Sequence, residues 1–320
     1  MGLSGGVDSA VAASLLKKEY EVIGVTLQMQ GDCFDSEDAR SVARRLEIEH
    51  HVIDCRTEFR AIKDYVTGEY LNGRTPNPCV RCNPTIKFAK MLAFANEAGA
   101  EFIATGHYSE VVKSGERYTL KKSDYKDQTY VLYGLTQEQL SRTLMPLANR
   151  NKDDVRALAA GLGLSVAEKP DSQDMCFEPQ FPEVPEGNFV DAEGNVLGRH
   201  KGIIHYTVGQ RKGLGIALGQ PVYVKEIRPE ANEVVLNYSD VYCDRIRINQ
   251  INCVGIPEIE EGKYIAKIRY SHKGQMCSII RLGADEAEIV FDEPARAATP
   301  GQSAVLYDEA GRVMLGGVIE

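Results

Sequence analysis

A glycine-rich loop near the start of the chain has the composition of an anion-binding site. Residues 4–9 read Ser-Gly-Gly-Val-Asp-Ser, and a helical pattern follows from Ser9 to Lys18. A helix N-terminus presents unpaired N–H groups and a partial positive charge, and glycine lets the backbone come close to an anion. The loop lacks the lysine that follows the last glycine of a Walker A loop. We therefore expect a phosphate site of another kind, with an ordinary strand-to-helix turn as the alternative.

Two cysteines, Cys79 and Cys82, form a C-x-x-C motif with three chemical interpretations. It can be half of a zinc site, a redox pair, or the site of a catalytic thiol. The sequence has no second C-x-x-C and no Cys/His pair at zinc-finger spacing, which argues against structural zinc. Arg81 and a helix expected to begin near Thr85 should both lower the pKa of the Cys82 thiol. This environment suits a nucleophile.

The other six of the eight cysteines carry weaker signals. Cys176 lies in the stretch Lys-Pro-Asp-Ser-Gln-Asp-Met-Cys-Phe, residues 169–177, and by itself a lone cysteine is more often a small buried hydrophobic residue. The same interpretation applies to Cys33, Cys55, Cys243, Cys253 and Cys277, which we expect to be inert. Eight cysteines in 320 residues argue against a disulfide scaffold and for a reducing compartment.

Composition indicates a multidomain globular protein. A chain of 320 residues with 43% hydrophobic and 26% charged residues predicts two or three domains. No membrane span or signal peptide is recognisable, so we expect a cytoplasmic protein. The net charge of -9 argues at first sight against nucleic acid, but residues 197–228 hold six Lys or Arg against one acid, and residues 72–90 hold four against none. Such local basic patches can contact phosphates on one face.

The first half of the sequence alternates helical and strand patterns, which predicts a parallel sheet with crossover helices. Helical periodicity also appears at 37–46 and 86–97, and short apolar runs lie at 22–27, 51–54 and 102–104. Thr136 with Gln139, and Asn151 with Asp154, have the spacing of helix capping boxes. Ligands of such sheets bind beyond the carboxyl ends of the strands, where the 4–9 loop and residues 105–107 are both expected.

The second half has the texture of β-structure. Residues 181–187 read as a linker, and short runs rich in Val, Ile and Tyr follow at 221–227, 264–270, 288–291, 304–307 and 313–319, with a hairpin turn expected at 308–311. We therefore predict one or two small β domains after an α/β domain. Only three residues precede the loop at residue 4, so we expect either a very short first strand or a true start several residues earlier than the given one.

Together these motifs closely resemble the tRNA-specific 2-thiouridylases of the N-type ATP pyrophosphatase superfamily. The resemblance also rests on residues 104–108, 126–128, 205–215 and 299–302, and it runs nearly end to end in the right order. It implies a Rossmann-like parallel sheet of the adenine nucleotide alpha hydrolase type over residues 1–180. Two small β-rich domains should follow, a central one at 181–243 and a C-terminal β-barrel that contacts tRNA at 244–320.

The resemblance also implies a reaction. Members of that family replace O2 of the wobble uridine, position 34 of tRNA, by sulfur. ATP with Mg²⁺ adenylates the oxygen, which turns it into a leaving group, and a cysteine persulfide delivers the sulfur. The expected partners are a tRNA with uridine 34 and a sulfur-relay protein or cysteine desulfurase as donor.

Site residues follow from the resemblance by motif. Cys176 matches the cysteine that accepts the persulfide, and Cys82 matches the cysteine that forms a transient disulfide with it. Contacts to ATP are expected from Gly2, Leu3, Ser4, Gly5, Gly6, Val7, Asp8, Ser9, Leu27 and Gly106, with Asp8 helping to place Mg²⁺. The target base is expected near Asn77, Pro78 and Cys79, and tRNA at His107, Lys126, Asp127, Gln128, Arg269, Tyr270 and Gln302.

Three departures from the family pattern leave alternatives open. Cys79 stands where many members have aspartate, so Cys79, Cys82 and Cys176 could together hold an iron-sulfur cluster that supplies the sulfur. Leu27 replaces a frequent methionine, and the stretch from Cys176 to Gly187 is short. Two other functions stay open: an amide-forming ATP pyrophosphatase acting on a small substrate, and an RNA-binding module without catalysis.

Overall fold

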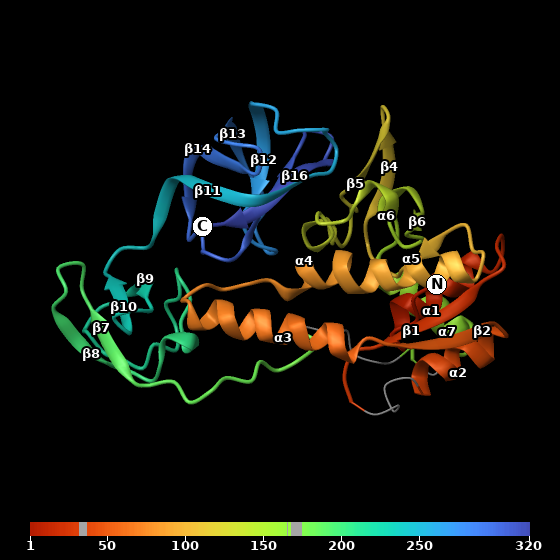
Figure 1. Ribbon diagram of the computed structural model, residues 1–320, viewed down its shortest axis with the longest axis horizontal. Coiled ribbons are helices and arrows are strands. Elements are labelled where there is room, and N and C mark those ends of the chain that lie inside the picture. Colours follow the sequence, from red (N-terminus) through yellow and green to blue (C-terminus); the bar gives the residue numbers. More distant parts are fainter. Residues whose placement is uncertain (32–36, 165, 168–174) are drawn as a thin grey trace. The chain divides into compact units, whose positions relative to one another are not determined.

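The computed structural model describes residues 1–31, 37–164, 166–167 and 175–320 as two compact units. The first unit comprises Met1–Ile62, Cys79–Phe177 and Ala310–Val313. The second comprises Lys63–Pro78, Glu178–Glu309 and Met314–Glu320. Figure 1 labels the helices and strands of both units along the chain.

A parallel sheet forms the centre of the first unit. Strand β1 (Ile23–Gln28) pairs in parallel with β2 (Glu49–Asp54), and β3 (Ile103–Ala104) pairs in parallel with β6 (Thr143–Leu144). The first residues of the chain join these two pairs, because the Gly2 N–H donates to the Ala104 carbonyl at 2.9 Å and the Leu3 N–H to the Val25 carbonyl at 2.7 Å. The expected short first strand is thus a bridge between neighbours, and it places residue 4 at the carboxyl edge of the sheet.

Helices cover both faces of this sheet (Figure 1). The apolar side chains of α1 (Val7–Leu16), α2 (Glu37–Leu46) and α7 (Lys152–Gly161) share one core cluster with Leu3. On the opposite face, α5 (Phe88–Glu97) places Met91 beneath Gly2, where an added Cβ would lie 2.9 Å from the Met91 sulfur. A sheet buried on both faces by crossover helices is the arrangement that the alternating pattern predicts.

Further elements of the first unit lie between β2 and α7. The 16-residue helix α3 (Arg56–Leu71) begins in this unit and ends in the second. Helix α4 (Pro78–Cys82) and a π-helical turn (Asn83–Lys87) precede α5. A hairpin of β4 (Glu110–Ser114) and β5 (Arg117–Lys121), a 3-10 turn (Thr129–Val131) and α6 (Gln137–Ser141) follow β3. The expected capping box of Thr136 and Gln139 is present, and Asn151 accepts a hydrogen bond from the Asp154 N–H at the start of α7.

The second unit contains two groups of strands. A four-stranded sheet has the order β8-β7-β10-β9, with β7 at Gly187–Val190, β8 at Val196–His200, β9 at Tyr223–Arg228 and β10 at Glu233–Asn237. A short 3-10 turn (Ile203–His205) lies beside it. Its core gathers around the buried Phe189 and Val234, and Tyr70 and Phe181 pack at its margin. The linker expected at 181–187 contains neither helix nor strand up to residue 186, and its last residue, Gly187, begins β7.

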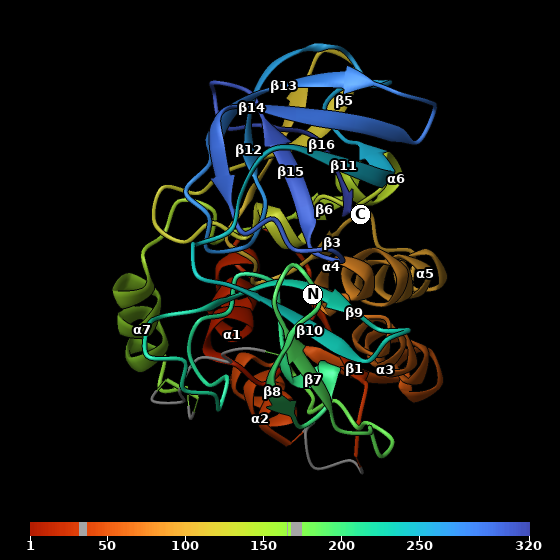
Figure 2. The ribbon, with the colours of Figure 1, turned by 90° about the vertical axis from the view of Figure 1, so that its left-hand side faces the viewer.

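Six strands close the C-terminal barrel in the order β11-β14-β13-β12-β15-β16. They are β11 (Tyr242–Cys253), β12 (Gly262–Lys267), β13 (Gln275–Arg281), β14 (Glu286–Arg296), β15 (Ser303–Tyr307) and β16 (Val313–Ile319). Figure 2 shows these strands curving around a common centre, which is filled by side chains such as Ile248, Ile289 and Leu315. Closure leaves no unpaired edge within the barrel. The α/β fold followed by β-rich segments and a final barrel is therefore confirmed.

Among the described residues, no helix combines the length and the apolar character needed to cross a bilayer.

Candidate functional site

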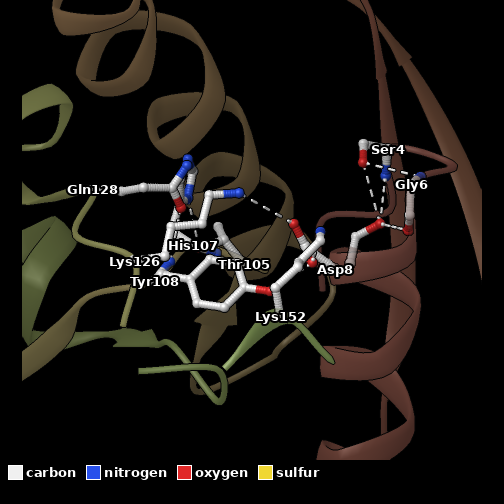
Figure 3. Close-up of polar contacts among 10 residues, drawn as sticks. Ser4, Gly6, Asp8, Thr105, His107, Tyr108, Lys126, Gln128 and Lys152 are labelled. Atoms are coloured by element: carbon white, nitrogen blue, oxygen red, sulfur yellow. Dashed lines mark hydrogen bonds and ion pairs between the residues drawn. The ribbon is translucent and has the colours of Figure 1, made fainter. Parts of the chain in front are cut away.

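The 4–9 loop is ordered by its own serines at the start of α1 (Figure 3). The Ser9 hydroxyl accepts from the Ser4 N–H at 3.2 Å and donates to the Gly6 carbonyl at 3.0 Å. Gly5 has φ +74°, a conformation that favours glycine, and Gly6 occupies the N-cap position without a side-chain cap. The helix N-terminus is thus held in shape but is not capped by a side chain, as an anion site at a helix start requires.

Asp8 in the first turn of α1 is the centre of a polar network (Figure 3). Its Oδ1 accepts hydrogen bonds from the Tyr108 hydroxyl and from Lys152 Nζ, both at 2.7 Å. Lys126 Nζ lies 4.0 Å from Asp8 Oδ2 and 4.9 Å from the centre of the Tyr108 ring. Two lysines and one carboxylate give the network a net positive charge beside the glycine-rich loop. This charge favours phosphate binding.

Gly106 brings the segment that follows β3 against the loop. A Cβ at this position would lie 2.8 Å from the Asp8 carbonyl carbon and 2.8 Å from the Ser9 nitrogen, so only glycine permits the approach. The expected meeting of the loop with residues 105–107 is therefore confirmed. The motif needs glycine at position 106 because the backbone of the loop occupies the space that a side chain would fill.

His107 is held by two neighbours and is uncharged near neutral pH. Its Nδ1 lies 2.9 Å from the Thr105 hydroxyl, and its ring stacks on Phe88 with centroids 6.0 Å apart. Burial lowers the pKa of His107 to about 3, and the positive charges of Lys87 and Lys126 act in the same direction. The ring is therefore a neutral hydrogen-bonding group and not a cation for phosphate.

Asp127 and Gln128 stabilise the backbone that carries Lys126. The Asp127 carboxylate accepts from the Thr129 N–H at 2.9 Å and from the Thr129 hydroxyl at 2.6 Å. Gln128 exchanges two hydrogen bonds with Tyr108, from the Tyr108 N–H to its side-chain oxygen at 2.8 Å and from its own N–H to the Tyr108 carbonyl at 3.0 Å. These contacts fix Lys126 and Tyr108 relative to Asp8.

The donor set at Asp8 suits Mg²⁺ only together with a phosphate ligand. Mg²⁺ in phosphate-transferring sites is bound by one or two carboxylates, with water and phosphate oxygens completing its shell. Asp8 provides one such carboxylate at the loop. Within the described ranges, no three His, Cys, Asp or Glu side chains are grouped as a metal-binding set, so a cluster site at the three cysteines is not assembled there.

Cys82 is not in the environment that the sequence predicts. It ends α4 inside a continuous helical run and is only 4% exposed, so it does not precede a helix N-terminus. Burial raises the pKa of the Cys82 thiol to about 11, although the positive charge of Lys87 opposes the rise. The expectation of a lowered pKa from Arg81 and a helix start is therefore wrong. The physical reason is desolvation, which outweighs the nearby charge.

Other thiols surround Cys82. Cys176, Cys79 and Cys55 all contribute to the raised pKa of Cys82, which places them in its electrostatic neighbourhood. Cys176 is exposed, and its carbonyl accepts from Gln30 Nε2 at 2.6 Å. No disulfide links any of the seven cysteines that the structure describes. Cys33 and residues 169–174 of the motif around Cys176 lie outside the described residues.

The remaining predicted positions are distributed over both units. Leu27 lies in β1, and Pro78 and Cys79 begin α4 directly after Asn77. In the second unit, Tyr270 is 44% exposed after β12, and the Arg269 Nε is buried without a hydrogen-bond partner. Gln302 donates from its side-chain amide to the Thr75 carbonyl at 2.7 Å, which gives this residue a structural contact.

Sequence reasoning missed Tyr108 and Lys152 as members of the Asp8 network. A signal for Lys152 was present: it is the first residue of α7, where a cation is unfavourable to the helix dipole unless it has another partner. Tyr108 directly follows the Thr-Gly-His motif, but its hydroxyl contact with Asp8, 100 residues away, depends on the fold.

Comparison with family models defines the class of protein. Residues 1–180 match the model of the tRNA methyl transferase HUP domain, and residues 179–237 match the tRNA methyl transferase PRC-barrel domain. Residues 243–319 match the aminomethyltransferase beta-barrel domain. The three matches follow one another along nearly the whole chain. They define a protein with an N-terminal HUP domain and two β-rich domains.

Full-length relatives specify the family within this class. The chain is 49% identical to the tRNA-specific 2-thiouridylase MnmA of Lachnoclostridium phytofermentans, with 99% of this chain and 97% of the relative covered. It is 47% identical to the protein of the same name from Acetivibrio thermocellus and 45% identical to that from Clostridioides difficile, each covering 100% of this chain and at least 96% of the relative. The chain belongs to the tRNA-specific 2-thiouridylase family.

Proposed function

We propose that the protein catalyses ATP-dependent 2-thiolation of the wobble uridine, position 34, of tRNA. The observation that carries the proposal is the presence, in one unit, of a positively charged loop site around Asp8 and a buried thiol, Cys82, with Cys176 in its neighbourhood. The relatives' names supply the substrate, a tRNA, and the reaction, 2-thiolation of a uridine. Neither an anion site nor a thiol pair alone would select this reaction.

The first step activates the uridine. Its O2 attacks the α-phosphorus of ATP, the bond to the β-phosphate oxygen breaks, and pyrophosphate leaves. The N–H groups of the 4–9 loop and the ammonium groups of Lys126 and Lys152 bind the departing pyrophosphate. Asp8 orients the two lysines, and its carboxylate would hold Mg²⁺. Mg²⁺ supplies neutralisation of phosphate charge.

The second step transfers sulfur. A sulfur-relay protein or cysteine desulfurase loads Cys176 with a persulfide, which its exposure permits. The terminal sulfur attacks C2 of the adenylated uridine, and AMP leaves. The Cys82 thiolate then attacks the Cys176 Sγ, so that the sulfur–sulfur bond breaks and its electron pair stays on the sulfur bound to C2. The products are 2-thiouridine and a Cys82–Cys176 disulfide, which a reductant reopens.

Burial of Cys82 suits this order of events. A thiol with a pKa of about 11 is protonated near neutral pH, which protects it from oxidation and from premature attack on the persulfide. It becomes a nucleophile when its proton is removed within the tRNA complex. The same reaction with an iron-sulfur cluster at Cys79, Cys82 and Cys176 is the alternative, and it requires the three thiols to gather around iron.

A single-turnover experiment tests the proposal. Iron-free protein is loaded with persulfide by a cysteine desulfurase and mixed with Mg-ATP and a tRNA transcript that carries uridine 34. We expect AMP, thiolated tRNA and a Cys82–Cys176 disulfide in equal amounts. Cys82→Ala and Cys176→Ala should yield no thiolated tRNA, while Cys243→Ser, at a half-buried cysteine of the barrel, should react like the unmodified protein. Thiolation that persists in Cys82→Ala would refute the assigned role of Cys82.

A further inference from the structure

A proline imposes a π-helical turn next to Cys82. Pro84 has no N–H to donate to the Val80 carbonyl four residues earlier. The helix accommodates this by a π-helical turn, Asn83–Lys87, in which the Phe88 N–H donates to the Asn83 carbonyl. Gln139 Nε2 donates to the Pro84 carbonyl at 2.8 Å, and Asn83 Nδ2 donates to the Val131 carbonyl at 2.7 Å. The widened turn is therefore fastened on two sides.

The π-turn determines where Lys87 points. In a turn closed by i to i+5 hydrogen bonds, residues five apart lie above one another, so Lys87 follows Cys82 on the same side of the helix. The next residue, Phe88, is fully buried and stacks on His107. His107 directly follows Gly106, which packs against the backbone of the 4–9 loop. Lys87 is therefore near both the thiol of Cys82 and the ring of His107. Its charge acts on both Cys82 and His107.

Lys87 is a half-buried cation whose charge is not neutralised within the described parts of the chain. Those parts give its ammonium group neither an ion pair nor a side-chain hydrogen bond, whereas nearby Lys90 is paired with Glu58. A partly desolvated charge without a counter-ion is unfavourable unless a ligand supplies one. At the other end of the same turn, the buried Asn83 Oδ1 also has no hydrogen-bond partner. Both observations indicate that this turn is completed by a bound molecule.

We propose that Lys87 binds the phosphate of the adenylated uridine and of the AMP that leaves it. The inference rests on the proposed function, because that reaction places a phosphodiester beside the attacking sulfur and then releases its phosphate as the monoester AMP. When sulfur displaces AMP from C2, negative charge develops on the phosphate-bearing oxygen. A cation near both Cys82 and His107 stabilises that charge at the place where it develops. Lys126 and Lys152 bind pyrophosphate in the preceding step, so Lys87 is the cation of the second step.

Nucleotide binding tests the proposal without requiring turnover. The dissociation constants of AMP and of adenosine are measured by calorimetry for the unmodified protein, Lys87→Met, Lys87→Arg and Lys18→Met. Lys18 is exposed in the turn that follows α1 and provides a control for the loss of one positive charge. We expect Lys87→Met to weaken AMP binding about tenfold or more, with adenosine binding changed less than about twofold. Lys87→Arg should retain most of the affinity, and Lys18→Met all of it.

The outcomes distinguish this proposal from the proposed function. Equal AMP affinity in Lys87→Met and the unmodified protein, or an equal loss for AMP and adenosine, would overturn the role of Lys87. Circular dichroism of each variant checks the fold, and Lys87→Gln provides a polar replacement should Lys87→Met be misfolded. Lys87-dependent AMP binding without any thiolated tRNA would overturn the proposed reaction alone. Failure of the unmodified protein to bind AMP would overturn the role of Lys87, while formation of thiolated tRNA tests the proposed reaction separately.

Discussion

The ion pair between Lys152 and Asp8 yields a stability prediction that can be worked out from its geometry. Lys152 Nζ donates to Asp8 Oδ1 at 2.7 Å, and the two side chains are only 22% and 27% exposed. A hydrogen bond to a charged group contributes about 1.5–3 kcal/mol, and removing one partner of a buried pair costs more than that. Asp8 keeps its bond from Tyr108 and some solvent in Lys152→Met, so we expect a loss of about 2 kcal/mol.

Urea unfolding followed by a probe in the first unit measures this loss. For a domain of this size, about 2 kcal/mol corresponds to a decrease in melting temperature of about 4–8 °C. Lys121→Met is the matched control, because Lys121 pairs with Glu110 at 3.6 Å and both side chains are more exposed, at 46% and 37%. Exposed pairs contribute about 0.2–1 kcal/mol. Equal destabilisation by Lys152→Met and Lys121→Met would refute the idea that the largely buried Lys152–Asp8 pair stabilises the first unit more than an exposed ion pair does.

Three further predictions concern the same unit. Gly106→Ala should abolish measurable ATP binding and lower the free energy of unfolding by about 1–3 kcal/mol, because the added Cβ would lie 2.8 Å from the loop backbone. Gly161→Ala, which has open space around its Cβ, should leave ATP binding and stability unchanged. ATP titration and urea unfolding measure the two effects. Because the pKa of His107 is lowered to about 3, its neutral form stabilises the fold above pH 6.5 and this contribution is lost as pH falls towards 3. His107→Gln should therefore lose less stability than the unmodified protein between pH 7 and 5, a difference of up to about 2 kcal/mol in urea unfolding, and identical losses would refute the pKa. Lys126→Met should lower the slope of log affinity for tRNA against log salt by about 1, and an unchanged slope would remove Lys126 from the phosphate contacts.

Local patterns in the sequence predict much of the fold. The helix at 37–46 and the strand at 313–319 appear with the expected bounds, because their hydrophobic residues recur at the spacing of one buried face. The capping box at Thr136 depends only on residues three apart, so it too is predictable. The 16-residue helix α3 was not predicted. Its first residues belong to the first unit and its last residues to the second, so its hydrophobic residues do not follow the pattern of one buried face.

The chemistry of the site depends on contacts that no local pattern contains. Cys82 was expected to have a lowered pKa from its neighbours in sequence, but the fold buries it and raises the pKa instead. The π-turn at Pro84 extends the helix back to residue 78, which removes the expected helix start. Lys152 reaches Asp8 across 144 residues. Burial and long-range pairing are tertiary properties: burial raises the pKa of Cys82, and long-range pairing brings Lys152 to Asp8.

The measurement that tests the central claim most directly is nucleoside mass analysis of tRNA after reaction with the iron-free protein, Mg-ATP and a cysteine desulfurase with cysteine as the persulfide source. The account predicts 2-thiouridine at position 34, formed only when ATP is present and lost in Cys82→Ala and Cys176→Ala. Product that forms solely after anaerobic reconstitution with iron would contradict the two-cysteine persulfide mechanism and make Cys79, Cys82 and Cys176 cluster ligands. Absence of thiolated uridine under both conditions would contradict the proposed function itself.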